Sequence, residues 1–118
     1  MSQEDFNRKF DRKVSRNYTL AEVAKRLSDK NDQIFIWANE PQIYFLADRA
    51  NIHRYTAAYH VYNYQGYVEV MKKLKTTPPR IIITETPGPY PFPELADFIK
   101  AYYSLSGEFD DAQVYLLN

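Results

Sequence analysis

The chain has 118 residues, which suits a single domain built around one hydrophobic core. Hydrophobic residues make up 45% of it and charged residues 25%, and the formal net charge is zero, so no overall basic field points to a nucleic-acid partner. The absence of cysteine excludes disulfides, thiolate nucleophiles and cysteine-based metal sites. No apolar run approaches the roughly 20 residues of a membrane helix, and we expect the chain as given to be soluble.

The first 17 residues are polar and densely charged. We treat residues 1–17 as a linker or leader, and residues 18–118 as a single α/β domain. Phe6, Phe10 and Val14 are spaced four apart, which also fits a short amphipathic helix, so both readings of this segment stay open.

A helix is predicted to begin at Thr19. Thr19 and Glu22 have the spacing of a capping box, and an apolar face with helical periodicity follows them. The polar run 28–32 ends this helix. Residues 33–38 (QIFIWA) then predict a buried strand, because four large apolar residues stand in a row.

Pro41 is suited to the first position of the next helix, which we expect to have two turns; a second strand is the alternative for this segment. The β-branched and aromatic residues of 52–61 predict a strand. A further helix is expected around residues 67–74, and the prolines at 78 and 79 end it.

The run RIIIT (80–84) predicts a second clearly buried strand. Residues 85–93 contain four prolines and a glycine, and are therefore expected to form a loop. A helix over 94–105 and a strand over 112–117 complete the chain. This alternation predicts an α/β fold: a small domain of two or three layers, with a mostly parallel sheet of about four strands flanked by helices.

In such sheets, ligands and partners bind beyond the carboxyl ends of the strands. Asn39 and Glu40 would lie at this edge after the first strand, and Glu85 after the RIIIT strand. Glu40 and Glu85 are therefore a candidate pair for acid–base chemistry, although solvated loop carboxylates are far more common. The three glycines cannot form a phosphate-binding loop, and the two histidines lack metal-binding spacing, so no cofactor or metal site is predicted.

Arg49 and Arg54 are the candidate ligands for an anionic group such as a lipid phosphate. For Arg49 the favoured interpretation is an ion pair that holds the loop, with Asp48, Glu40 or a carboxylate across the sheet edge.

The segment IFIWANEPQIYFLADRANIHRY (34–55) resembles the pattern I-F-x-W-G-x-x-P-x-I-Y-x-x-x-x-R, followed by R-Y or R-F. This pattern is typical of the C-terminal soluble part of bacterial multi-pass glycosyltransferases of the dolichyl-phosphate-mannose protein mannosyltransferase type, in the GT-C class. The stretch around PPRIII (78–83) and the ending VYLL (114–117) agree with it more weakly. Ala38 departs from the pattern, where the family often has glycine.

The resemblance implies a domain that follows the last membrane helix, on the extracytoplasmic face of the cell membrane. Its parent enzyme would transfer a sugar from a polyprenyl-phosphate carrier, with catalytic acids in loops between membrane helices. No catalytic residue is therefore carried over to this chain. The domain would cover the active site or contact the acceptor, and its partners would be the membrane-embedded part of the same polypeptide and, with it, the polyprenyl-phosphate sugar or the acceptor. The candidate functional edge consists of Trp37, Asn39, Glu40, Tyr44, Arg49, Arg54 and Glu85.

A second hypothesis comes from a different class. The chain would be a free-standing small soluble α/β enzyme, for example a hydrolase, using Glu40 and Glu85.

Overall fold

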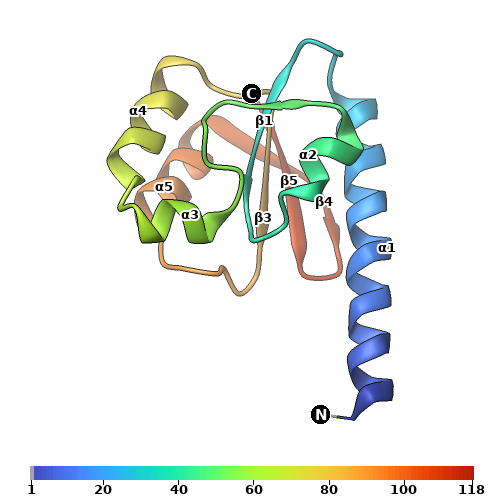
Figure 1. Ribbon diagram of the computed structural model, residues 1–118. Coiled ribbons are helices and arrows are strands. Elements are labelled where there is room, and N and C mark those ends of the chain that lie inside the picture. Colours follow the sequence, from blue (N-terminus) through green and yellow to red (C-terminus); the bar gives the residue numbers. More distant parts are fainter. Residues whose placement is uncertain (1) are drawn as a thin grey trace.

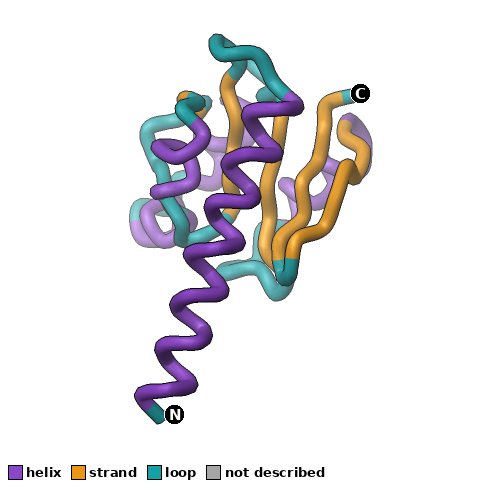
Figure 2. The backbone as a smooth tube through the Cα atoms, turned by 90° about the vertical axis from the view of Figure 1, so that its right-hand side faces the viewer, coloured by secondary structure: helices purple, strands orange, loops and turns teal. Residues whose placement is uncertain are grey.

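A single long helix, α1 (Gln3–Leu27), forms the N-terminal part of the fold. The computed structural model describes residues 2–118 of the chain. Residues 3–17, treated above as a linker or a short helix, are the first half of α1. Every described residue before Arg16 is exposed, and the N-terminal part of α1 extends beyond the rest of the molecule (Figure 1 and Figure 2).

The start of α1 differs from the prediction. The side chain of Ser2 accepts a hydrogen bond from the Asp5 amide at 3.0 Å and caps the helix. Thr19 lies in mid-helix, where its hydroxyl donates to the Ser15 carbonyl at 3.1 Å. The capping-box spacing at Thr19 was misleading because the same residues also fit the interior of a longer helix.

The sheet has five strands in the order β2-β1-β3-β5-β4. Strand β1 pairs in parallel with β2 and β3, whereas β5 pairs antiparallel with β3 and β4. The strands are β1 (Gln33–Trp37), β2 (Ala50–Asn51), β3 (Ile81–Glu85), β4 (Tyr103–Phe109) and β5 (Ala112–Leu117). The α/β class is thus confirmed, but the expected mostly parallel, four-stranded sheet was wrong. The added strand β4 forms a hairpin with β5, and hairpin strands pair antiparallel.

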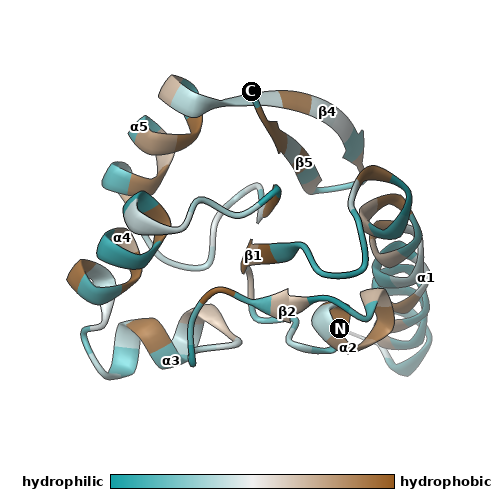
Figure 3. Cartoon of the chain, turned by 90° about the horizontal axis from the view of Figure 1, so that it is seen from above, coloured by the Kyte–Doolittle hydropathy of each residue, from teal (hydrophilic) through white to brown (hydrophobic). Residues whose placement is uncertain are grey.

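Helices cover both faces of this sheet (Figure 3). The remaining helices are α2 (Gln42–Ala47), α3 (Ala58–Asn63), α4 (Tyr67–Thr76) and α5 (Pro93–Tyr102). One apolar cluster joins α1 and α2 to a sheet face, around Leu20, Ile36 and Ile83. The second joins α3, α4 and α5 to the other face, around Phe35, Leu74 and Phe98. None of the described helices has the length and apolarity needed to cross a membrane.

Two further predictions were wrong in the middle and at the end of the chain. The strand expected over 52–61 is absent, and α3 begins at Ala58 instead. The start of α3 is stabilised by the chain after β1, since the side-chain oxygen of Asn39 accepts from the Tyr59 amide at 2.8 Å and the Ala38 carbonyl accepts from the Ala58 amide at 3.0 Å. The helix expected to reach Leu105 ends at Tyr102, and β4 begins at Tyr103.

Candidate functional site

The carboxyl ends of β1 and β3 lie side by side. Trp37, the last residue of β1, is in register with Thr84, and Glu40 and Glu85 come shortly after these two positions. After β1 the chain turns to α2 on one sheet face, and after β3 it turns to α5 on the other. Such a reversal is the topological switch point, where α/β proteins bind their ligands.

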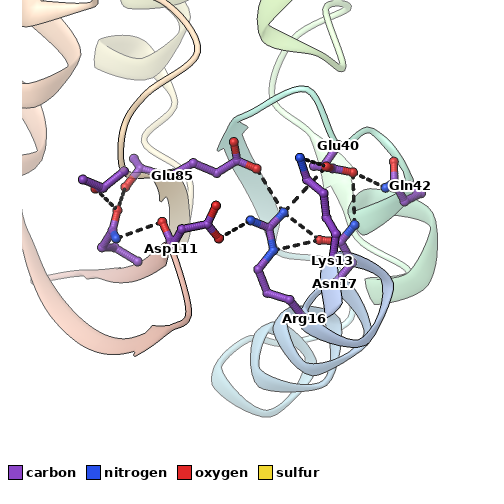
Figure 4. A network of polar contacts seen from close by, with 10 residues as sticks. Lys13, Arg16, Asn17, Glu40, Gln42, Glu85 and Asp111 are labelled. Carbon is purple, nitrogen blue, oxygen red and sulfur yellow. Dashed lines mark hydrogen bonds and ion pairs between the residues drawn. The ribbon is translucent and has the colours of Figure 1, made fainter. Parts of the chain in front are cut away.

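Arg16 of helix α1 fills this position (Figure 4). Its side chain is only 2% exposed. One terminal nitrogen, Nη2, lies 3.0 Å from Oε1 of Glu85 and 3.8 Å from Oε1 of Glu40, while Nη1 donates to the Asp111 carboxylate in the β4–β5 turn. The guanidinium therefore connects α1 to the ends of β1 and β3 and to the turn of the hairpin.

Glu40 is held from the other side by α1 as well. Its Oε1 lies 2.8 Å from Nζ of Lys13, and its Oε2 accepts from Nδ2 of Asn17 at 3.1 Å and from the side-chain Nε2 of Gln42. Asn17 in turn accepts from Nη2 of Arg16 at 2.9 Å. We call this cluster the Arg16 network: Lys13, Arg16, Asn17, Glu40, Gln42, Glu85 and Asp111.

The electrostatics of the Arg16 network favour fully charged cations. Burial alone would lower the pKa of Arg16, but hydrogen bonds to Asp111 and Glu85 and their negative charges outweigh it and raise that pKa. The hydrogen bond to Glu40 is the largest cause of the raised pKa of Lys13. Oε1 of each candidate carboxylate thus faces a cation of α1, an arrangement suited to holding elements together.

Two candidate edge residues are embedded in the core. The Trp37 ring packs against Phe92 at 4.8 Å between centroids, and its indole nitrogen donates to the Tyr90 carbonyl at 3.3 Å. The Tyr44 hydroxyl accepts from the Ile36 amide at 2.8 Å and donates to Asn51 at 3.1 Å. Because β2 is short, this hydroxyl replaces a strand acceptor for Ile36. Burial raises the pKa of Tyr44.

Arg49 does not form the expected ion pair with Glu40, Asp48 or a carboxylate across the sheet edge. Its guanidinium donates to the hydroxyl of Ser28 at 2.9 Å and, more weakly, to the carbonyls of Lys25 and Ser28. These groups lie at the C-terminus of α1, where carbonyls lack helical partners and a cation is favourable. Arg49, just before β2, therefore caps the C-terminus of α1.

Arg54 and Asn39 have different surroundings from the Arg16 network. The Arg54 side chain is 69% exposed, lies over the Tyr55 ring at 4.8 Å, and is 3.4 Å from a Glu69 oxygen that belongs to α4. Its pKa is raised, mainly by the hydrogen bond to Tyr55. Asn39 caps α3. The seven candidate edge residues thus have different roles. Glu40 and Glu85 belong to the Arg16 network, and Arg54 is exposed. The other four stabilise the fold: Trp37, Asn39, Tyr44 and Arg49.

The sequence reading missed the residue at the centre, because Arg16 fell in the supposed leader. A signal was present: Arg16 lies four residues before Leu20, and Asn17 four before Ala21, so a continued helix places both on the buried face. Within residues 2–118, no group of three or more acidic, histidine or cysteine side chains is arranged to hold a metal ion. Comparisons of the chain with family models, with curated proteins and with solved structures found no match.

Proposed function

We propose that this chain is the non-catalytic, extracytoplasmic domain of a multi-pass membrane glycosyltransferase that transfers sugar from a polyprenyl-phosphate carrier. The observation that carries the proposal is the combination of the 34–55 signature with helix α1. Glu40, which lies inside the 34–55 segment, is bound by Lys13 and Asn17 of α1, and α1 then extends beyond the domain on the side where β1 and β3 end (Figure 1).

The extended half of α1 offers a surface for the membrane-embedded part of the same polypeptide. Phe6, Phe10 and Tyr18 are each more than half exposed, and Val14 between them is 38% exposed. Their spacing of four residues places them in one row, and the rings of Phe6 and Phe10 stack at 6.4 Å. Exposed apolar rows of this kind are typical of surfaces that contact another protein.

The ion pairs of Glu40 and Glu85 weigh against the alternative of a free-standing enzyme. An acid–base pair needs at least one carboxyl group whose oxygens are free to reach the reacting atom. Here each carboxylate is bound by the buried Arg16, and Glu40 also by Lys13. A role in fixing α1 to the sheet accounts for both residues without a reaction.

Within the signature, Phe45 and Arg54 are the residues best placed to contact the acceptor or the membrane-embedded part. Phe45 is 85% exposed on α2, and the Arg54 side chain is 69% exposed. In contrast, hydrogen bonds within the domain occupy the polar side-chain groups of Trp37, Tyr44 and Arg49.

The first test is the genomic reading frame around the coding sequence. The proposal predicts several hydrophobic, membrane-spanning segments encoded in frame upstream of residue 1. An in-frame stop codon directly upstream, with no such segments, would contradict it.

The second test measures sugar transfer from a polyprenyl-phosphate donor by the parent enzyme in membranes. Phe45→Ala and Arg54→Ala are each expected to lower transfer by about tenfold or more. Matched controls are Val68→Ala, also strongly exposed, and Lys75→Ala on α4, outside the signature. Equal activity of all four variants would show that the signature surface makes no functional contact.

A further inference from the structure

A hollow of about 550 Å³ lies on the sheet face opposite α1, between the proline loop (residues 86–92), α5 and strands β3 and β5. Its floor includes Trp37, Thr84 and Tyr115, and its walls include Tyr90 and Ala96. The volume is within the range of natural small-molecule sites. The hollow lies beside the switch point, but it is separate from the Arg16 network, whose α1 residues reach the edge from the other face.

The fold keeps this hollow open. On the helix side, α5 presents Ala96, whose side chain ends at Cβ. On the loop side, the indole of Trp37 donates to the Tyr90 carbonyl at 3.3 Å, and the Tyr90 ring stacks on Tyr62 of α3 with centroids 4.3 Å apart. The loop is thus held at a distance from the sheet, and a ligand would find the walls already formed.

The lining has an apolar, aromatic character with one charge at its rim. Thr84 donates its hydroxyl proton to Gln113 at 2.9 Å, so this hydroxyl already has a hydrogen-bond partner without a ligand. Lys100, in the last turn of α5, is the one charged residue of the lining, and no ion pair links it to another residue in the described part of the chain. An aromatic floor suits a flat apolar body, and the ammonium group suits a single acidic group at its end.

We propose that this hollow is a binding site for a small organic anion with an aromatic body and one acidic group. The site does not depend on the proposed function: it would exist equally in a membrane-bound parent and in a free-standing domain.

The test uses 1-anilinonaphthalene-8-sulfonate as the probe and the 118-residue chain as the receptor. Fluorescence titration is expected to give one site per chain, with a dissociation constant of roughly 100 µM or lower. The uncharged N-phenyl-1-naphthylamine is expected to bind several times more weakly. In ¹H–¹⁵N spectra, the probe is expected to shift the amides of Thr84, Gly88, Lys100 and Tyr115.

Two variants and two matched controls locate the site. Ala96→Trp fills the hollow and is expected to weaken binding by at least about tenfold, whereas Ala101→Trp, exposed on the same helix outside the hollow, should leave it unchanged. Lys100→Gln is expected to weaken binding by roughly three- to fivefold, the loss typical of a partly exposed charge pair. Lys75→Gln, in the last turn of α4, is the control for charge.

Near-UV circular dichroism of each variant establishes that the chain remains folded, because this probe also binds loosely packed states. Absence of saturable binding would overturn the proposal. Equal binding by all four variants, or amide shifts confined to the exposed half of α1, would also overturn it.

Discussion

The guanidinium of Arg16 lies 3.0 Å from the carboxylate of Glu85, although the two residues are 69 positions apart in the chain. A second pair, Arg8 and Asp5, has the same distance of 3.0 Å within α1. The environments differ: the Arg16 and Glu85 side chains are 2% and 13% exposed, whereas those of Arg8 and Asp5 are 67% and 57% exposed. The Arg16–Glu85 pair joins α1 to β3, whereas the Arg8–Asp5 pair joins two residues of one helix and is also screened more strongly by water.

Deleting residues 2–11 should leave the free energy of unfolding unchanged within about 0.5 kcal/mol, because these residues are exposed and lie outside the core. Urea denaturation measures this. Leu20→Ala, which removes a fully buried side chain of the same helix, should cost about 2–5 kcal/mol. A loss of more than 2 kcal/mol on deletion would mean that the extended half of α1 packs against the domain, since surface changes rarely cost this much.

Tyr44→Phe should lower the free energy of unfolding by about 1–3 kcal/mol. The substitution leaves the Ile36 amide buried without its acceptor, and the cost is that of an unsatisfied buried donor. Urea denaturation again provides the measurement, with Tyr64→Phe as the control because Tyr64 is 70% exposed. Equal stability of the two variants would show that the hydroxyl of Tyr44 does not complete the strand.

The stability of the domain should fall at alkaline pH. Burial raises the pKa of both Tyr44 and Tyr103 above their ordinary value of 10.0. Above about pH 10 the unfolded chain therefore releases protons that the folded chain retains, so the free energy of unfolding decreases as the pH rises. Each of the two tyrosines can contribute up to about 1.4 kcal/mol per pH unit.

Urea denaturation between about pH 9 and 11.5 measures this slope. Tyr44→Phe should make the decrease shallower, and Tyr64→Phe should leave it as in the unmodified chain. A slope unaffected by Tyr44→Phe would show that Tyr44 ionises as readily in the folded state as in the unfolded one.

The elements that were predicted correctly are those that a few neighbouring residues are enough to identify. The strands at 33–38 and 80–84 are runs of large apolar residues, and the proline loop follows from composition. Strand β4 has no such signal, because its sequence YSLSGEF contains two serines and a glycine. It becomes a strand by pairing with β5, an interaction that local periodicity does not report.

The candidate site was predictable only in part, for a related reason. The sequence predicted that Glu40 and Glu85 follow strands at the carboxyl edge of the sheet, but nothing in it fixed their distance, which depends on the pairing of β1 with β3. Arg16 and Asp111 were missed because α1 is fixed by tertiary contacts, and the charged composition of residues 1–16 resembles that of a linker. Strand β3 pairs in parallel with β1 but antiparallel with β5, and this was not predicted either. It depends on the β4–β5 hairpin, whose turn brings Asp111 to the sheet edge.

Arg49→Lys should destabilise the domain by about 1–2 kcal/mol, because a lysine cannot reproduce the several hydrogen bonds to Ser28 and Lys25 at the end of α1. Arg26→Lys, at an exposed position in the last turn of the same helix, is the control and should be neutral within about 0.5 kcal/mol. Thermal or urea unfolding of the two variants provides the comparison. If both changes were neutral, Arg49 would not be a helix cap.

The double-mutant cycle of Arg16→Met and Glu85→Gln tests the role of the Arg16 network most directly, with the cycle of Arg8→Met and Asp5→Asn as its exposed counterpart. Free energies of unfolding from urea denaturation give one coupling energy for each pair. The structure predicts about 2 kcal/mol or more for Arg16–Glu85 and less than about 1 kcal/mol for Arg8–Asp5, despite their equal distances. Coupling energies that agree within about 0.5 kcal/mol would contradict the account, because they would mean that Arg16 does not fix α1 to the end of β3.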